Sequence, residues 1–345
     1  MKKILSVLLA AMLLMLTAVP AFAMPFNAGV DELKTQFVKA EGPETDGLAI
    51  GYHYFSPVKE NDSAKYPLVV WLHGMGDGFE DGRLLESTNI AYWTSDEFQA
   101  RFTNGGAFIF APRSDESKGL CWNSGTIEPL KAAIDGFIAE NKDNIDLSRI
   151  YIGGYSMGGK MTLKMAIAFP EMFAAAFPIC PAWSPDEEAF SYIADMPVWI
   201  TSGKTDPLVN YDFSVTKTFE KLSKTSNVAS ECRLSILSKV CYEDGSKTSS
   251  GHHSWFAVNH DMFSSTNGDY PYMSTVNGLG ETVTLTFPDG MISWLCAHTS
   301  DYDGAPSRGQ GNLDNVSNKD NILGITGIID FFKTLIEAIK NLFGF

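Results

Sequence analysis

Residues 149–163 read RIYIGGYSMGGKMTL, and this stretch decides the fold. The apolar, β-branched run 149–153 predicts a buried strand, and residues 157–168 have the pattern of a helix. Between them stands GYSMG at 154–158, a GxSxG sequence. A serine on a sharp strand-to-helix turn is strained, its flanking glycines admit neighbouring backbone, and the helix N-terminus presents free N–H groups. We therefore interpret Ser156 as a nucleophile rather than as part of a chance glycine-rich turn.

Strand and helix patterns alternate on both sides of this turn. The predicted strands are residues 47–55, 67–72, 107–111, 149–153, 173–179 and 197–201. The predicted helices are residues 127–141, 157–168 and 213–222. This alternation indicates βαβ crossovers and a mostly parallel sheet that is covered on both faces. Because such sheets bind ligands at the carboxyl ends of their strands, we expect the functional residues there.

A second turn, HGMGD at 73–77, follows a predicted strand. A backbone N–H in such a turn can stabilise an oxyanion. We assign this role to the N–H of Met75, with Gly76 as the alternative, and the second donor to the N–H of Met157. An ordinary glycine turn has the same composition, and His73 is interpreted as a structural residue.

A serine hydroxyl needs a base to take its proton, and the base needs an acid to hold its tautomer. Asp206 lies after the strand 197–201, in the order Ser, acid, His that suits this turn. A capping or turn aspartate before a proline is the alternative interpretation of Asp206. Asp212 and Asp186 are further candidates for the acid.

The candidate base lies in GHHSW at 251–255. Two adjacent histidines are not expected to point the same way, so only one of them can be the base. We choose His252, and His253 and His260 are the alternates. His298 lies too late in the chain for this role, and His53 lies too early.

Net charge limits the classes of binding partner, and the N-terminal residues indicate the compartment. The chain has 345 residues and a net charge of −15, which argues against nucleic acid and against electrostatic docking to anionic lipid. Residues 1–23 have two lysines, an apolar run and an AFA cleavage pattern, which predict a signal peptide and a secreted or cell-surface protein. An uncleaved membrane anchor is the alternative.

The cysteines bear on possible disulfides and on metal binding. An exported chain can form disulfides, and Cys232 and Cys241 flank a short segment that they could bridge. Buried, reduced thiols are the alternative. The sequence has no CxxC or Cys/His zinc spacing, so neither a metal nor any other cofactor is expected.

The remaining chain divides into three parts. Residues 24–299 are predicted to form the catalytic domain, and residues 300–321 a polar linker. Apolar residues recur at helical spacing in 322–345, which predicts an amphipathic C-terminal helix. Such a helix would cover the enzyme's own surface, a second copy of the chain or a membrane interface. We favour attachment to a surface or to a second chain.

Four stretches carry a resemblance to a known family. They are YPLVVWLHGMGDG at 66–78, RIYIGGYSMGGKMTLKMA at 149–166, SGKTDPLV at 202–209 and GHHSW at 251–255. Together they resemble the secreted esterase branch of the α/β-hydrolases, which includes feruloyl and acetylxylan esterases and polyhydroxybutyrate-depolymerase-like enzymes. HGMGD and DPLV are also similar to the phospholipase/carboxylesterase group.

The resemblance covers residues 47–297 and implies an α/β-hydrolase fold. It also implies a triad of Ser156, Asp206 and His252, with the N–H groups of Met75 and Met157 as oxyanion donors. The sequence departs from the family at residues 256–257, where Phe and Ala replace a polar residue, and in an insertion at 264–290.

The expected substrate is an ester, of the polysaccharide-linked or aryl kind such as feruloyl and acetyl esters. The segment before the strand 197–201 is too short for a large lid, so an open site is predicted. Aromatic side chains near the predicted strand ends are candidates to stack on a phenolic acid or a sugar, with core packing as the alternative. They are Trp122, Tyr155, Trp183 and Trp255.

Two other functions are compatible with the predicted fold. A serine peptidase of the prolyl-oligopeptidase type has the same triad, although it usually needs an extra domain. A non-catalytic surface binding protein could keep the fold, but candidates for Ser, Asp and His in the expected order argue against it.

Overall fold

The apolar runs of the sequence form the centre of a nine-stranded sheet in the computed structural model, which describes residues 30–116, 121–242, 245–246, 248–265, 268–286 and 288–304. Across the sheet the strands are β1 (Val38–Glu41), β2 (Gly51–Phe55), β4 (Phe108–Arg113), β3 (Tyr66–Leu72), β5 (Ile145–Tyr155), β6 (Ala175–Ile179), β7 (Trp199–Gly203), β8 (Arg233–Leu237) and β11 (Met273–Asn277). A separate hairpin pairs β9 (Ser264–Ser265) with β10 (Gly268–Asp269).

The sheet is parallel in its centre and antiparallel at its two edges. Every neighbouring pair from β4 to β8 is parallel, whereas β1, β2 and β11 pair antiparallel. All seven residues of β3 and all five of β6 are buried. A strand buried on both faces is apolar throughout, which is why these segments have continuous apolar runs rather than alternation.

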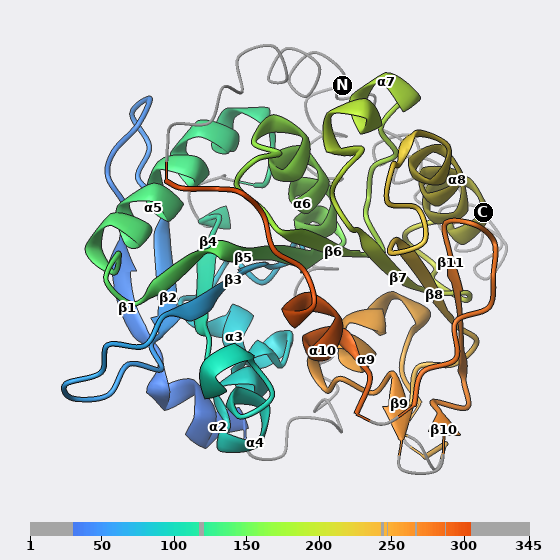
Figure 1. The fold of residues 1–345 in the computed structure, drawn as a ribbon, viewed down its shortest axis with the longest axis horizontal. Helices are drawn as coiled ribbons and strands as arrows, with labels where there is room; N and C mark the ends of the chain where they lie inside the picture. Colours follow the sequence, from blue (N-terminus) through green and yellow to red (C-terminus); the bar gives the residue numbers. More distant parts are fainter. Residues whose placement is uncertain are drawn as a thin grey trace, which may run out of the picture.

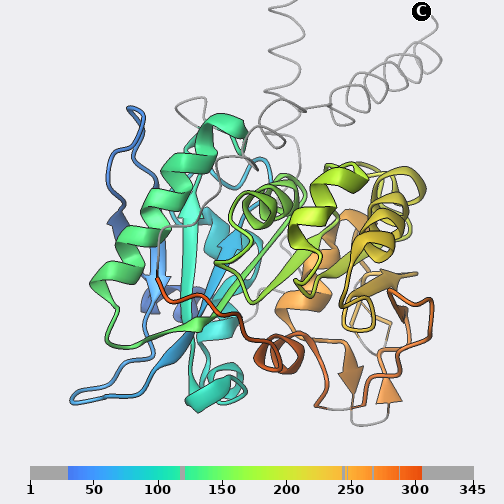
Figure 2. The same ribbon diagram turned by 45° about the horizontal axis from the view of Figure 1, so that its top comes forward.

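Helices cover both faces of the sheet, as the edge-on view in Figure 1 shows. One layer contains α5 (Ile127–Glu140), α6 (Met157–Ala168), α7 (Glu187–Phe190) and α8 (Thr216–Thr225); the other contains α2 (Val30–Leu33), α3 (Arg83–Ser87), α4 (Asp96–Gln99), α9 (Trp255–Asn259) and α10 (Met291–Cys296). The turned view in Figure 2 shows the same two layers. A mostly parallel sheet with helices on both faces is therefore confirmed.

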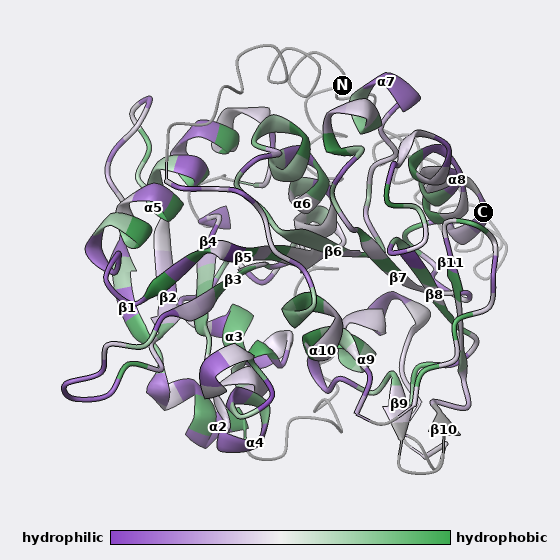
Figure 3. Ribbon diagram, viewed as in Figure 1, coloured by the Kyte–Doolittle hydropathy of each residue, from purple (hydrophilic) through white to green (hydrophobic). Residues whose placement is uncertain are grey.

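Short helical turns complete the connections. They are η1 (Lys34–Gln36), η2 (Ile90–Thr94), η3 (Thr103–Gly105), η5 (Ser124–Thr126), η6 (Ser191–Ile193), the π-helix η7 (Tyr211–Val215) and η8 (Gly251–Ser254). The helix predicted at 213–222 therefore begins as η7 and continues as α8. Figure 3 shows hydrophobic colours on the central strands and hydrophilic colours on outer surfaces such as α7, as expected for a core built around the sheet.

Three strands of the nine-stranded sheet were not predicted from the sequence. They are β1, β8 and β11, which lie towards the sheet edges and have polar residues among their apolar ones. The stretch 264–290, interpreted as an insertion, supplies β11 and so extends the sheet beyond β8. It also contains both strands of the β9–β10 pair.

The predicted signal peptide 1–23, most of the linker 300–321 and the tail helix 322–345 lie outside the described residues. Within the described part, no helix combines the length and apolar character needed to cross a membrane.

The Cys232–Cys241 disulfide considered from the sequence is not formed, and all five cysteines are free thiols. Cys232 lies before β8, where its sulfur contacts the Ser226 hydroxyl at 3.5 Å. Cys241 lies beyond the other end of the strand, 3.5 Å from the Tyr270 hydroxyl. An extended strand between two cysteines carries them too far apart for a disulfide.

Candidate active site

Ser156 is the single residue between the end of β5 and the start of α6, and its backbone conformation is strained. Its φ of 56° and ψ of −114° fall outside the regions that a residue with a side chain prefers. The Ser156 N–H donates to the Ile179 carbonyl at 2.9 Å, and the Ser156 carbonyl accepts from Ala182 at 3.1 Å. The end of β6 therefore holds the turn in place.

Glycines around Ser156 let the turn lie directly on the end of β3. A Cβ at Gly154 would lie 2.3 Å from the Leu72 carbonyl oxygen, and a Cβ at Gly158 would lie 2.0 Å from the same atom. Neither approach is possible for a residue with a side chain. The two motifs that the sequence singled out, HGMGD and GYSMG, are thus in contact.

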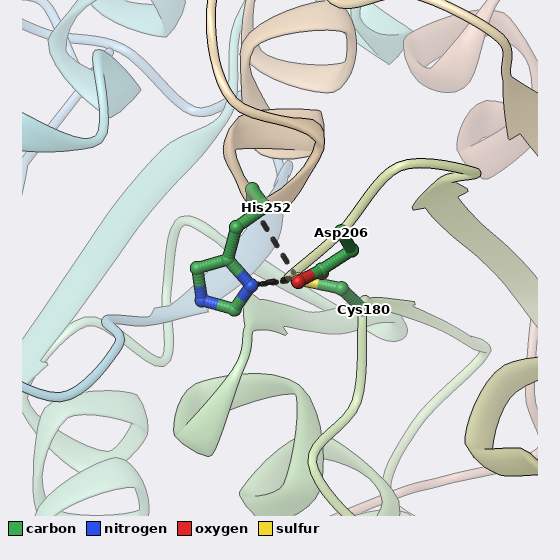
Figure 4. A group of neighbouring side chains, drawn as sticks. All are labelled: Cys180, Asp206 and His252. Atoms are coloured by element: carbon green, nitrogen blue, oxygen red, sulfur yellow. Dashed lines mark hydrogen bonds and ion pairs between the residues drawn. The ribbon is translucent and has the colours of Figure 1, made fainter. Parts of the chain in front are cut away.

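Asp206 and His252 come together at the same end of the sheet, from the loops after β7 and β8. Asp206 Oδ2 accepts a hydrogen bond from His252 Nδ1 at 2.8 Å, and its carboxylate is fully buried. Asp206 Oδ1 accepts from the N–H groups of Leu208 and Val209 at 2.8 and 2.9 Å. Figure 4 shows the imidazole with Nδ1 turned to Asp206 and its other ring nitrogen pointing away.

Two more glycines allow these loops to meet. A Cβ at Gly203, the last residue of β7, would lie 2.2 Å from the Gly251 carbonyl oxygen. A Cβ at Gly251 would lie 2.6 Å from the Asp206 backbone nitrogen. The loop that carries the histidine therefore packs backbone to backbone against the loop that carries the aspartate.

The hydrogen bond to Asp206 fixes the chemistry of His252. Because a carboxylate only accepts, Nδ1 carries the proton, and Nε2 of the neutral ring is left as the acceptor. Burial by itself lowers the pKa of His252, but the Cys180 thiol and the Asp206 carboxylate raise it, and the balance lies above the usual value. His252 Nε2 is therefore a basic atom with a defined direction.

The other candidate histidines and acids have different partners. His253 Nδ1 contacts the Ser249 hydroxyl at 2.6 Å, and burial and the neighbouring His252 lower the His253 pKa. His260 contacts Asn89 at 3.0 Å. Asp186, a candidate acid, caps α7 by accepting from the Ala189 N–H at 3.1 Å. Of the three candidate acids, Asp206 is the one whose carboxylate accepts a hydrogen bond from a candidate histidine in the described part of the chain.

The turn that follows β3 is built around a buried His73. His73 Nδ1 donates to the Gly74 carbonyl at 2.7 Å, and Nε2 accepts from the Ser114 N–H at 3.0 Å. Trp122 Nε1 donates to the His73 carbonyl at 2.9 Å. Burial lowers the His73 pKa, so this ring is neutral and holds three segments together.

Two buried acids for which no role was predicted from the sequence are Asp77, within the same turn, and Glu116, which contacts it. Tyr155, the residue before Ser156, donates its hydroxyl to Asp77 Oδ2 at 2.5 Å. Glu116 Oε2 accepts from the Gly76 N–H at 2.7 Å. Burial and the nearby Asp77 charge outweigh the hydrogen bonds that Glu116 accepts, and they raise its pKa to about 7. Glu116 lies in a loop without a motif, so no local pattern pointed to it.

The four aromatic residues predicted to stack on substrate are all buried. Trp122 and Trp255 have exposed fractions of 0% and 1%, and Trp183 and Tyr155 have 4% and 8%. Trp183 lies over the Lys164 ammonium at 5.3 Å, and Tyr155 packs against Trp255 at 6.1 Å. A ring without exposed surface cannot present a face to a ligand, so packing is the role that this conformation supports for them.

One cluster among the described residues has the donor set for a metal ion. Cys180 Sγ, an Asp206 carboxylate oxygen and a His252 ring nitrogen lie within 4.8 Å of one another (Figure 4). His252 Nδ1 already donates its proton to Asp206, so a cation would have to displace that proton.

The comparisons with known proteins agree with this geometry. Residues 123–248 match the phospholipase/carboxylesterase family. A poly(3-hydroxybutyrate) depolymerase of Ralstonia pickettii is 27% identical over 48% of this chain and 35% of its own length. A poly(3-hydroxyalkanoate) depolymerase C of Paucimonas lemoignei is 31% identical over 36% of this chain and 30% of its own. The chain thus spans about a third of the length of these curated relatives.

A solved structure described as a thermostable esterase superposes with a TM-score of 0.55 at 29% identity, covering 66% of this chain and 61% of that one. With the sheet and the Ser156 turn described above, this likeness defines the chain as an α/β-hydrolase. Within that class, the chain is similar to carboxylesterases and to poly(3-hydroxybutyrate) depolymerases. The α/β-hydrolase fold predicted from the sequence is therefore confirmed.

Proposed function

We propose that this chain is a serine hydrolase of carboxylic esters in which Ser156 is the nucleophile, His252 the base and Asp206 the acid. The observation that carries the proposal is the 2.8 Å hydrogen bond from His252 to Asp206, at the sheet end where Ser156 occupies its strained turn. The likeness to carboxylesterases and polyester depolymerases supports the choice of an ester as substrate.

The proposed reaction has two stages. Ser156 Oγ attacks the ester carbonyl carbon while His252 Nε2 takes the hydroxyl proton. The N–H groups of Met75 and Met157 then donate to the oxyanion; neither N–H has a hydrogen-bond acceptor among the described residues. The alcohol leaves with the proton from His252, and water attacks the acyl-enzyme by the reverse route. No step requires a cofactor.

The experiment that tests this proposal is Ser156→Ala, assayed on a short-chain aryl ester. Loss of the nucleophile should reduce kcat by about 10⁶. The circular dichroism spectrum should stay unchanged, because the substitution removes only the side-chain hydroxyl. A fluorophosphonate label should react with the unaltered chain and fail on the variant. Substantial hydrolysis by a clean Ser156→Ala preparation would remove Ser156 from the role and the proposal with it.

Two substrate classes compete within this proposal. Polysaccharide-linked or aryl esters, such as feruloyl and acetyl esters, suit an open site, and the link between β6 and β7 holds only α7 and η6. Poly(3-hydroxybutyrate) is the second class, because both curated relatives are named for polyesters of this type. A parallel assay of feruloyl, acetyl and hydroxybutyrate esters separates the two classes by kcat/KM.

We also propose that the chain is exported, because residues 1–23 carry a signal-peptide pattern. The apolar stripe of residues 322–345 would then serve attachment to a surface or to a second copy.

A further inference from the structure

The segment 73–78, which we call the oxyanion loop, has no helix or strand of its own. Met75 within it has an exposed side chain, so burial of Met75 does not hold the loop. A loop that must hold one N–H close to a fixed position and direction needs contacts elsewhere that anchor it.

Glu116 supplies the first anchor. Its carboxylate accepts the N–H of Gly76, the residue directly after Met75, at 2.7 Å, and it also accepts from the Gly78 N–H. Gly76 has a φ of +98°, a conformation that glycine adopts without strain. A Cβ at Gly78 would lie 3.2 Å from Glu116 Cγ. The Glu116 carboxyl therefore packs directly against the loop, and only 9% of the residue is exposed.

Asp77 supplies the second anchor. Its carboxylate accepts from the hydroxyl of Tyr155, which precedes Ser156 in the chain, and a Cβ at Gly74 would lie 2.5 Å from the Tyr155 ring. The Asp77 contact ties the oxyanion loop to the Ser156 turn, whereas the Glu116 contact ties it to the loop after β4. The peptide between Met75 and Gly76 is thus fixed from the Glu116 side.

We propose that Glu116 is a positioning residue. By holding the peptide between Met75 and Gly76 through the Gly76 N–H, it restrains the backbone directly after Met75 and so the direction of the Met75 N–H, which belongs to the preceding peptide. The inference rests on the proposed function, and it adds a residue outside both sequence motifs.

The ionisation of Glu116 makes the anchor sensitive to pH. An ionised carboxylate accepts both N–H groups, whereas the protonated acid keeps one good acceptor oxygen. Burial raises the Glu116 pKa to about 7, with the Asp77 charge acting in the same direction. The hydrogen bonds from Gly76 and Gly78, and the Arg83 charge from the start of α3, act in the opposite direction.

The other ionisable groups around Glu116 are Cys121, whose thiol pKa rises partly through the Glu116 charge, and the Tyr155 hydroxyl, whose pKa lies well above its usual value. Neither group titrates below pH 7. Because Glu116 loses its proton above about pH 7, the anchor strengthens as the pH rises through that value.

The experiment compares Glu116→Ala, Glu116→Gln and the exposed control Glu188→Gln in the full chain, on an aryl ester. Glu116→Ala leaves the Gly76 N–H without an acceptor, so kcat should fall about tenfold to hundredfold, less than the loss of a whole oxyanion donor. KM should change by less than about twofold, because the loop acts on the transition state. Glu188→Gln should match the unaltered chain.

Glu116→Gln gives a readout that a merely structural role would not change. The amide resembles the protonated acid, so kcat should be about fivefold lower than that of the unaltered chain at pH 8, and the two values should converge at pH 6. The ratio of the two kcat values cancels the titration of His252, which both proteins share. If Glu116→Ala does not fold, this ratio carries the test alone.

A pH-independent ratio for Glu116→Gln, or kcat within twofold of the control for a folded Glu116→Ala protein, overturns the inference. Failure of the proposed function has a different signature, since there Ser156→Ala would keep its hydrolysis. Failure of the present inference requires an enzyme that depends on Ser156 and ignores Glu116.

Discussion

Two enclosed histidines, His252 and His260, lie on either side of α9 and differ in one partner. His252 donates to a buried carboxylate, and its pKa is raised. His260 lies between the rings of Tyr92 and Phe256, with centroids at 4.4 and 4.3 Å, and burial lowers its pKa to about 4. Burial alone thus gives a neutral ring that packs, whereas a carboxylate gives a base with one free nitrogen.

The largest expected effect on this comparison comes from removing the ring that contacts the carboxylate. His252→Ala should lower kcat by about 10⁶, as for loss of the nucleophile, because base and nucleophile act as a unit. His253→Ala is the matched control, since its partner is Ser249 rather than Asp206, and its kcat should fall by less than about tenfold. The measurement is kcat on an aryl ester at pH 8. If His253→Ala proves the more damaging change, the base is one residue further on.

Asp206→Asn tests the carboxylate in place of the ring. Asparagine can present an N–H to Nδ1, which reverses the tautomer of His252 and puts the proton on Nε2, so kcat should fall by about 10⁴. The N–H groups of Leu208 and Val209 keep the side-chain oxygen as an acceptor, so the loop should stay folded. A steady-state assay and a melting curve check both statements. A variant with nearly full turnover would show that His252 needs no acid.

His260 should affect stability rather than turnover. The unfolded chain binds a proton on this histidine below pH 6.5, whereas the folded chain does so only near pH 4. The folded state therefore loses about 3 kcal/mol relative to the unfolded state as the pH falls between these values. Denaturant unfolding of His260→Phe at pH 7 and pH 4.5 should give a smaller difference than the unaltered chain. Equal differences in the two proteins would contradict this assignment.

Much of the fold followed from the sequence because the central strands are apolar throughout. β3 and β6 could be predicted within one or two residues, and α6 to the residue, since burial on both faces leaves an unbroken apolar run. β8 and β11 could not be predicted, because polar residues interrupt their apolar runs and their pairing depends on contacts between distant segments.

The residues of the candidate site also differ in whether the sequence could predict them. Ser156 and its glycines form one continuous motif, so their geometry could be anticipated. Glu116 lies far along the chain from its Gly76 partner, in a loop with no recurring pattern, and only the tertiary structure shows the contact. For the four aromatic residues the sequence left ligand contact and core packing open, because nearness to a strand end does not tell a buried ring from an exposed one.

The backbone contact between the turn at Ser156 and the end of β3 limits how this molecule can be redesigned. Gly154 and Gly158 both face the Leu72 carbonyl, and Gly74 faces the Tyr155 ring, so no side chain can be added on either side of this seam. A randomised library that includes these codons would consist mostly of misfolded members. New specificity has to be sought instead in segments outside the seam, such as the loop around Leu208, whose side chain is 61% exposed. For directed evolution, the two motifs are therefore best inherited together as a single block.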